Sequence, residues 1–335
     1  NNASDKVQGL DGTHPGTDTF TITVKDADGA TVKIPVNVIV TGKSDAPQVT
    51  VGEVIKATEG STESYEGHVI AHDKDAADQE PGALKYQFDE NAVDAHNANA
   101  ADGEEWVLSA DGTELTTQYG TYTIDQDGKY TFELNNDADA VRKLAAGTLT
   151  EQKVTVVVTD AQDNAVTQDV TVNITGKNTA PDFLDDAGNR IMPDDDGKVT
   201  VEANTENSPL KESSETASSD ATLTGKFGFA DPDDGGSVVA RFAIDANGKE
   251  IRLSDDGPTT IQGKYGTLVI QKDGSYTYTY TSDVLGEGVT ASENFTLKLT
   301  DNYGASSEAQ LVVNLAGTND RPEITRAQDL EITES

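Results

Sequence analysis

The feature that most constrains the fold of this chain is a long internal repeat. Residues 18–47, 152–181 and 293–322 each contain an alternating strand, a turn with aspartate, a second alternating strand and a short stretch from glycine to proline. The prolines that end these segments, Pro47, Pro181 and Pro322, set a repeat of roughly 135–140 residues. A repeat of this length predicts tandem modules, each with a core of its own.

A second pair of matching segments lies inside the repeat. The segments are YGTYTIDQDGKYTFEL, which begins at Tyr119, and YGTLVIQKDGSYTYTY, which begins at Tyr265. Both alternate apolar and polar residues around Asp-Gly, which is typical of a β-hairpin. Helical periodicity is nearly absent, and the best helix candidate, 137–146, is two or three turns at most. The pattern predicts an all-β fold of antiparallel sandwiches with Greek-key connections.

The repeat also predicts the domain boundaries. We expect the C-terminal part of one module at 1–41, complete sandwiches at 48–175 and 182–316, the start of a further module at 323–335, and hinges at 42–47, 176–181 and 317–322. The first segment lacks most of a sandwich, so its strands need a partner to cover them, or it is half of a split module. The complete modules differ by insertions, at 91–105 in one and around Pro193 and 205–220 in the other. Such insertions usually lie in surface loops, where ligand-binding variation is found.

The charge of the chain limits its partners. Lys and Arg number 24 and Asp and Glu 60, which gives a net charge of −36. Binding to nucleic acid requires clustered basic residues, so nucleic acid is not expected as a partner. No run of 18 apolar residues occurs, so we expect no insertion into a membrane, and targeting is expected to be encoded elsewhere. With no cysteine, small cores need another source of stability, and bound metal is the obvious one.

Acidic residues near the hinges predict calcium sites. Calcium takes six to eight oxygen ligands, mostly carboxylates and carbonyls, and a six-residue hinge brings the end of one module close to the start of the next. The candidates are Asp26, Asp28, Asp45, Asp73 and Asp75 at the first hinge, Asp160, Asp163, Asn178, Asp231 and Asp233 at the second, and Asp301, Asn319 and Asp320 at the third. In both Asp-x-Asp pairs the spacing puts the two side chains on one side of an extended segment. The alternative is that these residues are ordinary turn aspartates.

The chain resembles the VCBS repeat of very large bacterial adhesins that are exported by type I secretion, including RTX adhesins. The resemblance is carried by the YGT…DGxYT hairpin, the run LAAGTLTE at 144–151, the V-T-D strand end and the TG(K/T)xxxP hinge. It implies immunoglobulin- or cadherin-like sandwiches in an extended rod, with calcium at the junctions. Cadherins also place a glutamate near the start of each domain, and Glu59 and Glu334 correspond to it by position. Two hinges depart from the Asn-Asp pair: 42–45 lacks the Asn and 176–179 lacks the Asp.

The expected function is structural. We expect an extracellular, calcium-stiffened spacer of a bacterial surface adhesin that projects ligand-binding domains for cell adhesion and biofilm formation. Its partners would be the neighbouring modules of the chain, while other domains would bind glycans or proteins of a host or biofilm. No nucleophile elbow, HExxH motif or third histidine beside His68 and His72 points to an enzyme. The alternatives are a module that itself binds glycan or protein, through 91–105 or the Pro193 loop, and an accessory module of a polysaccharide-active enzyme.

Overall fold

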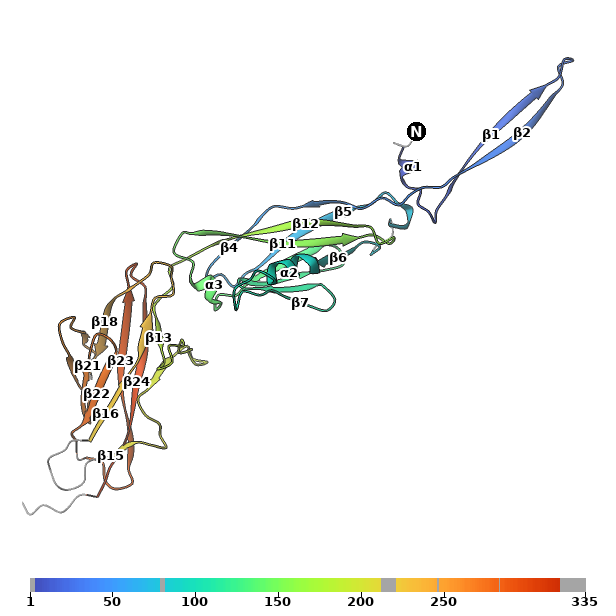
Figure 1. Cartoon of the computed structure of the whole chain (residues 1–335). Helices are drawn as coiled ribbons and strands as arrows, with labels where there is room; N and C mark the ends of the chain where they lie inside the picture. Colours follow the sequence, from blue (N-terminus) through green and yellow to red (C-terminus); the bar gives the residue numbers. More distant parts are fainter. Residues whose placement is uncertain (1–3, 79–81, 212–220, 246, 283, 320–335) are drawn as a thin grey trace, which may run out of the picture. The chain divides into compact units, whose positions relative to one another are not determined.

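The computed structural model describes residues 4–78, 82–211, 221–245, 247–282 and 284–319. The chain divides into two compact units, Asn1–Lys177 and Asn178–Ser335, and each is described by itself. Nearly all of the regular structure is β-strand (Figure 1). Among the described residues no helix has the length and apolar character needed to cross a membrane.

The first unit contains a sandwich of two sheets. One sheet has the order β3 (Gln48–Val51), β5 (Ser64–His72), β10 (Lys129–Leu134), β9 (Gly120–Ile124), β8 (Glu114–Thr117) and β7 (Val107–Leu108). The other has the order β4 (Ile55–Thr58), β12 (Ala165–Thr175), β11 (Leu149–Thr159) and β6 (Lys85–Phe88). Only β4 and β12 run parallel. These orders match the ABED and CFG sheets of an immunoglobulin sandwich, with the first strand divided between the two sheets.

The second unit repeats this arrangement. One sheet has the order β16 (Ala221–Lys226), β22 (Ser275–Tyr280), β21 (Gly266–Ile270) and β20 (Thr259–Gln262). The other has the order β14 (Val199–Glu202), β24 (Ser306–Ala316), β23 (Thr290–Asp301), β18 (Val238–Ile244) and β19 (Glu250–Arg252), with β15 (Leu210–Lys211) also on β24. A short pair, β13 (Asp182–Leu184) and β17 (Gly228–Ala230), completes the unit. The predicted class, tandem immunoglobulin- and cadherin-like antiparallel β-sandwich domains, is confirmed.

Alternation along the strands builds the cores. In β11 the side chains of Val154, Val156 and Val158 are buried, while the residues between them point outward. The predicted hairpins are also present, since β9 pairs with β10 and β21 with β22. At the first of these turns Gly128 has φ +77°, and a Cβ there would lie 2.2 Å from the carbonyl oxygen of Val69. Only glycine fits this turn.

A buried polar residue joins the two sheets of each sandwich. In the second sandwich the Tyr278 hydroxyl donates to Oε2 of Glu293 at 2.5 Å, and the backbone N–H groups of Lys264 and Tyr265 donate to Oε1. Burial, and then the hydrogen bond to Glu293, raise the pKa of Tyr278. In the first sandwich Gln152 takes this place and accepts from the Tyr122 hydroxyl at 3.1 Å. The polar group is therefore kept, but its chemistry differs between the modules.

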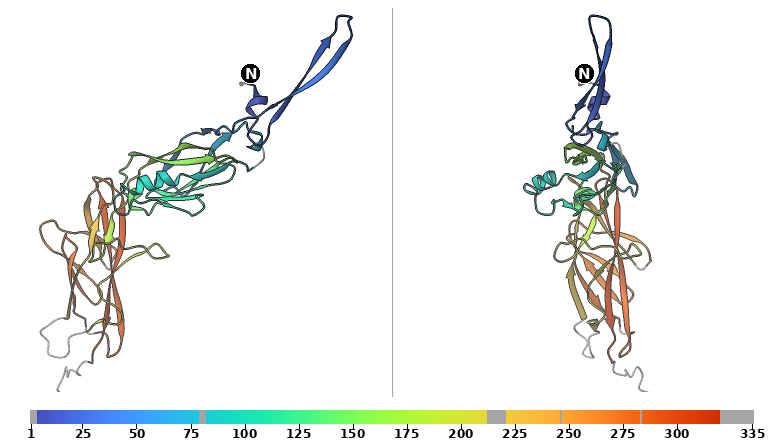
Figure 2. Two further views of the ribbon diagram at one scale, coloured as in Figure 1. Left: turned by 45° about the vertical axis from the view of Figure 1, so that its right-hand side comes forward. Right: turned by 90° about the vertical axis from the view of Figure 1, so that its right-hand side faces the viewer.

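The helices are short. They are α1 (Asp5–Gln8), the 3₁₀ turn η1 (Ala76–Asp78), α2 (Glu90–Asn97) and α3 (Asp139–Arg142). The helix candidate 137–146 is thus limited to the four residues of α3. The 91–105 insertion instead begins with α2, which stands out from the side of the first sandwich in the right-hand view of Figure 2.

A separate hairpin precedes the first sandwich. It consists of β1 (Gly16–Lys25) and β2 (Thr31–Val40), which pair only with each other in the described part of the chain. Phe20, Ile22 and Ile34 on one of its faces remain 46–49% exposed, whereas the matching valines of β11 are buried. The hairpin thus has an apolar face like that of a core strand pair, but no second sheet covers it among the described residues. Its assignment to the last part of a module stays a prediction.

Candidate metal sites

Four segments of the chain meet at one end of the first sandwich. Gln48 of β3 pairs with His72 of β5, and Lys85 of β6 pairs with Thr159 of β11. The hinge before β3, the segment after β5 and the β11–β12 turn therefore lie at the same end. This is the end at which the chain enters the sandwich.

Three aspartates are gathered there. Asp73, Asp75 and Asp78 are buried, and one carboxylate oxygen of each lies within 4.8 Å of the others. Calcium binds oxygens at about 2.3–2.6 Å, so ligands of one ion lie up to roughly 5 Å apart. The hydrogen bonds fix the cluster: the Asp75 N–H donates to Oδ1 of Asp73 at 2.9 Å, and the Ala161 N–H donates to Oδ1 of Asp78 at 2.9 Å. Oδ2 of Asp78 is buried and accepts no hydrogen bond from the residues that the structure describes.

The hinge and the β11–β12 turn complete this site. The backbone N–H of Asp45, in the hinge, donates to Oδ2 of Asp75 at 3.0 Å. Asp160, in the turn, is 2% exposed and accepts from the Asn164 side chain at 2.7 Å. Burial raises the pKa of Asp73, and the charges of Asp75, Asp78 and Asp160 raise it further. A cluster of hard oxygen donors with mutually repelling charges suits a divalent cation such as calcium.

The second sandwich has a matching site. The Thr179 N–H, in its hinge, donates to Oδ2 of Asp233 at 3.0 Å, and the Asp233 N–H donates to Oδ1 of Asp231 at 3.1 Å. The Asn178 side chain donates to Oδ2 of Asp301 at 2.9 Å. The other oxygens, Oδ2 of Asp231 and Oδ1 of Asn178, are buried and accept no hydrogen bond. Burial, followed by the charge of Asp301, raises the pKa of Asp231.

The two sites differ at the position of Asp78. The Asp78 N–H donates to the carbonyl of Asp75, and the Gly236 N–H donates to the carbonyl of Asp233 in the same way. A Cβ at Gly236 would lie 2.4 Å from the carboxyl group of Asp231, so the second site has no room for a side chain there. The second site therefore lacks the third acid that the first one has.

The predicted grouping of the acids is wrong for the turn residues. Asp160 was assigned to the second hinge and Asp301 to the third, but each lies with the Asp-x-Asp pair of its own sandwich. The reason is the length of the last strand. The 11 residues of β12 separate the Asp160 turn from the following hinge by about 35 Å. Asp26 and Asp28 are likewise a ten-residue strand away from the first hinge, and Asp26 caps its own turn.

The remaining candidates lie elsewhere. Asp163 is exposed with φ 64° in the β11–β12 turn, and Asn319 is exposed; Asp320 and Glu334 lie outside the described residues. Glu59 is buried at the opposite end of the first sandwich, where its Oε2 accepts from the Lys177 N–H at 2.7 Å. Glu59 thus contacts the hinge that follows its module, and its role as a calcium ligand stays a prediction. Asp78 was missed, although the spacing in DKDAAD could have indicated it.

The raised pKa values predict an unusual pH dependence without metal. In chelator, the Asp73, Asp78 and Asp231 carboxyls favour the folded state below pH 4, and this stability is lost as pH rises through their raised pKa values. Acids with lowered pKa, such as Asp185, are almost fully ionised in both states from about pH 5 upward and add little slope there. We therefore expect a higher melting temperature at pH 5 than at pH 7 in chelator. With calcium the difference should shrink or reverse, because protons compete with the ion. Melting curves that show no such dependence on calcium would contradict the assignment.

Fold and site together describe tandem immunoglobulin-type sandwiches, each with an acidic cluster where the chain enters. No family model matches the chain. Over 230 residues, 68% of this chain and 83% of the relative, the sequence is 26% identical to the calcium-binding lectin RapA2 of Rhizobium johnstonii.

Solved structures similar to the chain include tandem cadherin domains. Mouse cadherin-23 EC22–24 has 12% identity and a TM-score of 0.33, with 90% of this chain and 74% of that chain covered. Protocadherin gamma B2 domains 3–6 have 13% identity and a TM-score of 0.31, with 90% and 57% covered. TM-scores this low carry no argument about function. The assignment of the site therefore depends on its own residues.

Proposed function

We propose that this chain is a calcium-binding, non-enzymatic spacer of an extracellular bacterial adhesin, in which the ions fix each hinge to the sandwich that follows it. The observation that carries the proposal is the hydrogen bond from a hinge N–H to the second aspartate of the Asp-x-Asp pair, at Asp45 in one unit and Thr179 in the other. The hinge backbone thus binds to the same carboxylates that would bind the ion. An ion bound there holds the backbone of the connection as well as the sandwich.

The mechanism follows from linked binding. An ion that binds only the ordered arrangement stabilises it by RT ln(1 + [L]/Kd), about 2.7 kcal/mol at a hundredfold excess over Kd. Without the ion, the buried aspartates repel one another and the hinge loosens. Calcium would therefore convert a flexible string of modules into a stiffer one after export into a calcium-rich medium.

The lectin relative supports calcium binding and an adhesive role. The resemblance to VCBS repeats of RTX adhesins supports the finer proposal, a spacer that projects ligand-binding domains for attachment and biofilm formation. Because the relative is a lectin, a glycan-binding role for the chain itself is the second candidate.

A calcium titration followed by melting tests the proposal. The single tryptophan, Trp106, lies in the first sandwich, so its fluorescence follows that unit, while calorimetry follows both. We expect saturating calcium to raise the melting temperature by roughly 5–10 °C. Magnesium should raise it less, because it keeps its water and demands octahedral geometry. X-ray scattering should show a narrower distribution of lengths with calcium, and identical melting and scattering in calcium and chelator would overturn the proposal.

A further inference from the structure

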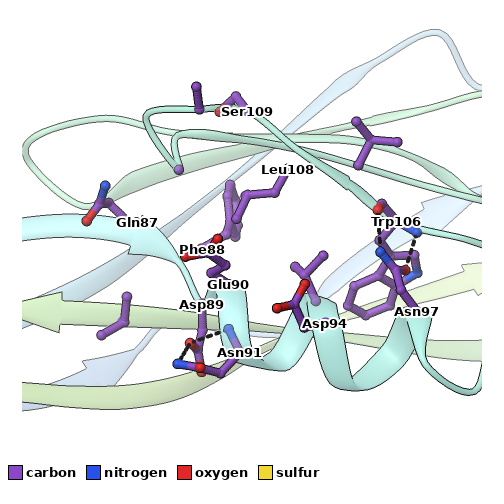
Figure 3. A pocket seen from close by; sticks show the side chains of 15 residues that line it. Gln87, Phe88, Asp89, Glu90, Asn91, Asp94, Asn97, Trp106, Leu108 and Ser109 are labelled. Carbon is purple, nitrogen blue, oxygen red and sulfur yellow. Dashed lines mark hydrogen bonds between the residues drawn. The ribbon is translucent and has the colours of Figure 1, made fainter.

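The first sandwich has a cleft beside α2 that is separate from the acidic site. Its volume is about 600 Å³, within the range of roughly 300–1,000 Å³ usual for small-ligand sites. It lies between α2, the end of β6 and the β7–β8 hairpin (Figure 3). Asp78 precedes β6 in the chain, whereas the cleft is formed by residues from the C-terminal end of that strand onward.

The cleft is held open by an ordered frame. Asp89 caps α2 by accepting from the Asn91 N–H at 3.1 Å, and Val93 anchors the helix in the core. Asn97 clamps the backbone of Trp106 from both sides, donating to its carbonyl at 2.8 Å and accepting from its N–H at 2.7 Å. His96 stacks on the Trp106 ring with centroids 4.0 Å apart. The insertion is therefore built as a fixed wall.

The lining combines an apolar floor with an acidic rim. Leu108 and Trp106, both partly exposed, supply apolar surface, and the buried side chains of Phe88 and Val93 lie beneath the floor. Asp94 stands on the helix opposite Leu108 in Figure 3, and Glu90 is also exposed on the rim. The rim includes the carboxyl groups of Glu90 and Asp94, while that of Asp89 caps the helix, and the lining contains no lysine or arginine.

We propose that this cleft binds a neutral, hydroxyl-rich oligosaccharide. Carboxylate and amide oxygens accept hydrogen bonds from sugar hydroxyls, while the apolar floor packs against the C–H face of a sugar ring. Carboxylates without a basic residue repel uronic, sulfated and phosphorylated sugars. The proposal rests on the second candidate function, glycan binding by the chain itself, and gives it a defined site and a class of sugar.

The second sandwich offers a natural comparison. After β6 the first sandwich continues into α2, whereas after β18 the second continues into β19 of the same sheet. The frame of Asp89, Asn97 and Trp106 therefore has no counterpart among the described residues of the second unit. Only the first sandwich would then bind the oligosaccharide, as expected of a specific site on one copy of a repeated fold.

Binding of defined glycans to the whole chain tests the proposal. The probes are neutral hexasaccharides of glucose, galactose and mannose, with hexasaccharides of galacturonic acid and a sulfated galactan as anionic counterparts, each titrated while Trp106 fluorescence is followed. We expect at least one neutral probe to bind with a Kd of about 0.1–1 mM, and the anionic probes to bind at least tenfold more weakly. No saturable binding of any neutral probe at 10 mM, about ten times the upper expected Kd, or equal binding of the anionic ones, would overturn it.

Two variants locate the site. Asp94 is exposed on α2, so D94A should keep the fold and weaken binding of the neutral probe at least tenfold. The matched control E114A removes an exposed acid of the same sandwich outside the cleft and should leave Kd unchanged. Unchanged binding by D94A overturns the assignment. Glycan binding should also persist in chelator, because the cleft is separate from the acidic site. The glycan experiment and the calcium-dependent melting can therefore fail independently. Loss of glycan binding in chelator would show that the ligand binds elsewhere.

Discussion

Replacing Asp160 with asparagine should abolish the calcium-dependent stabilisation of the first sandwich and leave that of the second intact. Asp160 is buried beside Asp73 and Asp78, and its charge acts on both. Removing one of the few anionic ligands from a hard-cation site should lower calcium affinity at least 100-fold, about 2.7 kcal/mol. The rise in melting temperature that Trp106 fluorescence reports should then disappear at calcium levels that saturate the natural chain.

The choice of asparagine separates binding from folding. Oδ1 of Asp160 accepts from the N–H groups of Gln162 and Asn164, and an asparagine oxygen can keep both bonds. The bond that Oδ2 accepts from the Asn164 side chain is lost, but the substitution also removes a charge that repels Asp73 and Asp78, which offsets the loss. In chelator, D160N should therefore melt close to the natural chain. The matched variant D301N should give the opposite pattern, with the first sandwich still responding to calcium. If D160N instead removed the response of the second sandwich, the grouping of acids by sandwich would be wrong.

The sequence was sufficient for the strands and for much of the candidate sites. Strict alternation in segments such as 152–159 defines which side chains enter the core, and Asp-Gly at 127–128 fixes a hairpin turn. Asp73, Asp75, Asp231 and Asp233 could be selected because the Asp-x-Asp spacing recurs at matching places in the two complete modules. These features are local, so they do not depend on the path of the chain in three dimensions.

Which acids share one site depends on the path of the chain in three dimensions and not on nearby residues alone. Proximity in the repeat placed Asp160 beside the next hinge, but the strand that follows the turn carries the chain the full length of the sandwich before that hinge begins. Counting the 11 residues of β12 at about 3.3 Å each would have placed the turn correctly. The absence of an acid at Gly236 depends instead on the space beside Asp231, which no spacing rule reveals.

The sequence of α2 contains residues typical of a helix start, but the strand-like alternation of the rest of the chain outweighed them in the prediction. Asp89 is a good N-cap, and Glu90 lies in the first turn, where its charge favours a helix. The eight-residue helix is nevertheless too short to be stable alone, so it depends on Val93 in the core and on the Asn97–Trp106 clamp. Those contacts span parts of the insertion that the sequence alone does not bring together.

Replacing Glu293 with alanine should destabilise the second sandwich by about 3–5 kcal/mol, in calcium and in chelator alike. The substitution leaves three donors without their acceptor: the buried Tyr278 hydroxyl and the partly buried N–H groups of Lys264 and Tyr265. Calorimetry should show the second unit melting well below its natural temperature, while Trp106 fluorescence reports an unchanged first unit. Equal melting of both units would contradict the expectation.

The first sandwich supplies the control for this experiment. Gln152 holds the position of Glu293 there and accepts from a buried tyrosine hydroxyl, so E293Q introduces a residue that the fold already uses at this place. Its amide oxygen can accept from part of the donor set, and the cost should fall to about 1–2 kcal/mol. Because Glu293 lies in the core and not in the acidic cluster, E293Q and E293A should both keep the full calcium-dependent rise in melting temperature. A shared loss of that rise would mean that the core and the metal site are coupled, and that calcium stabilises more than the hinge.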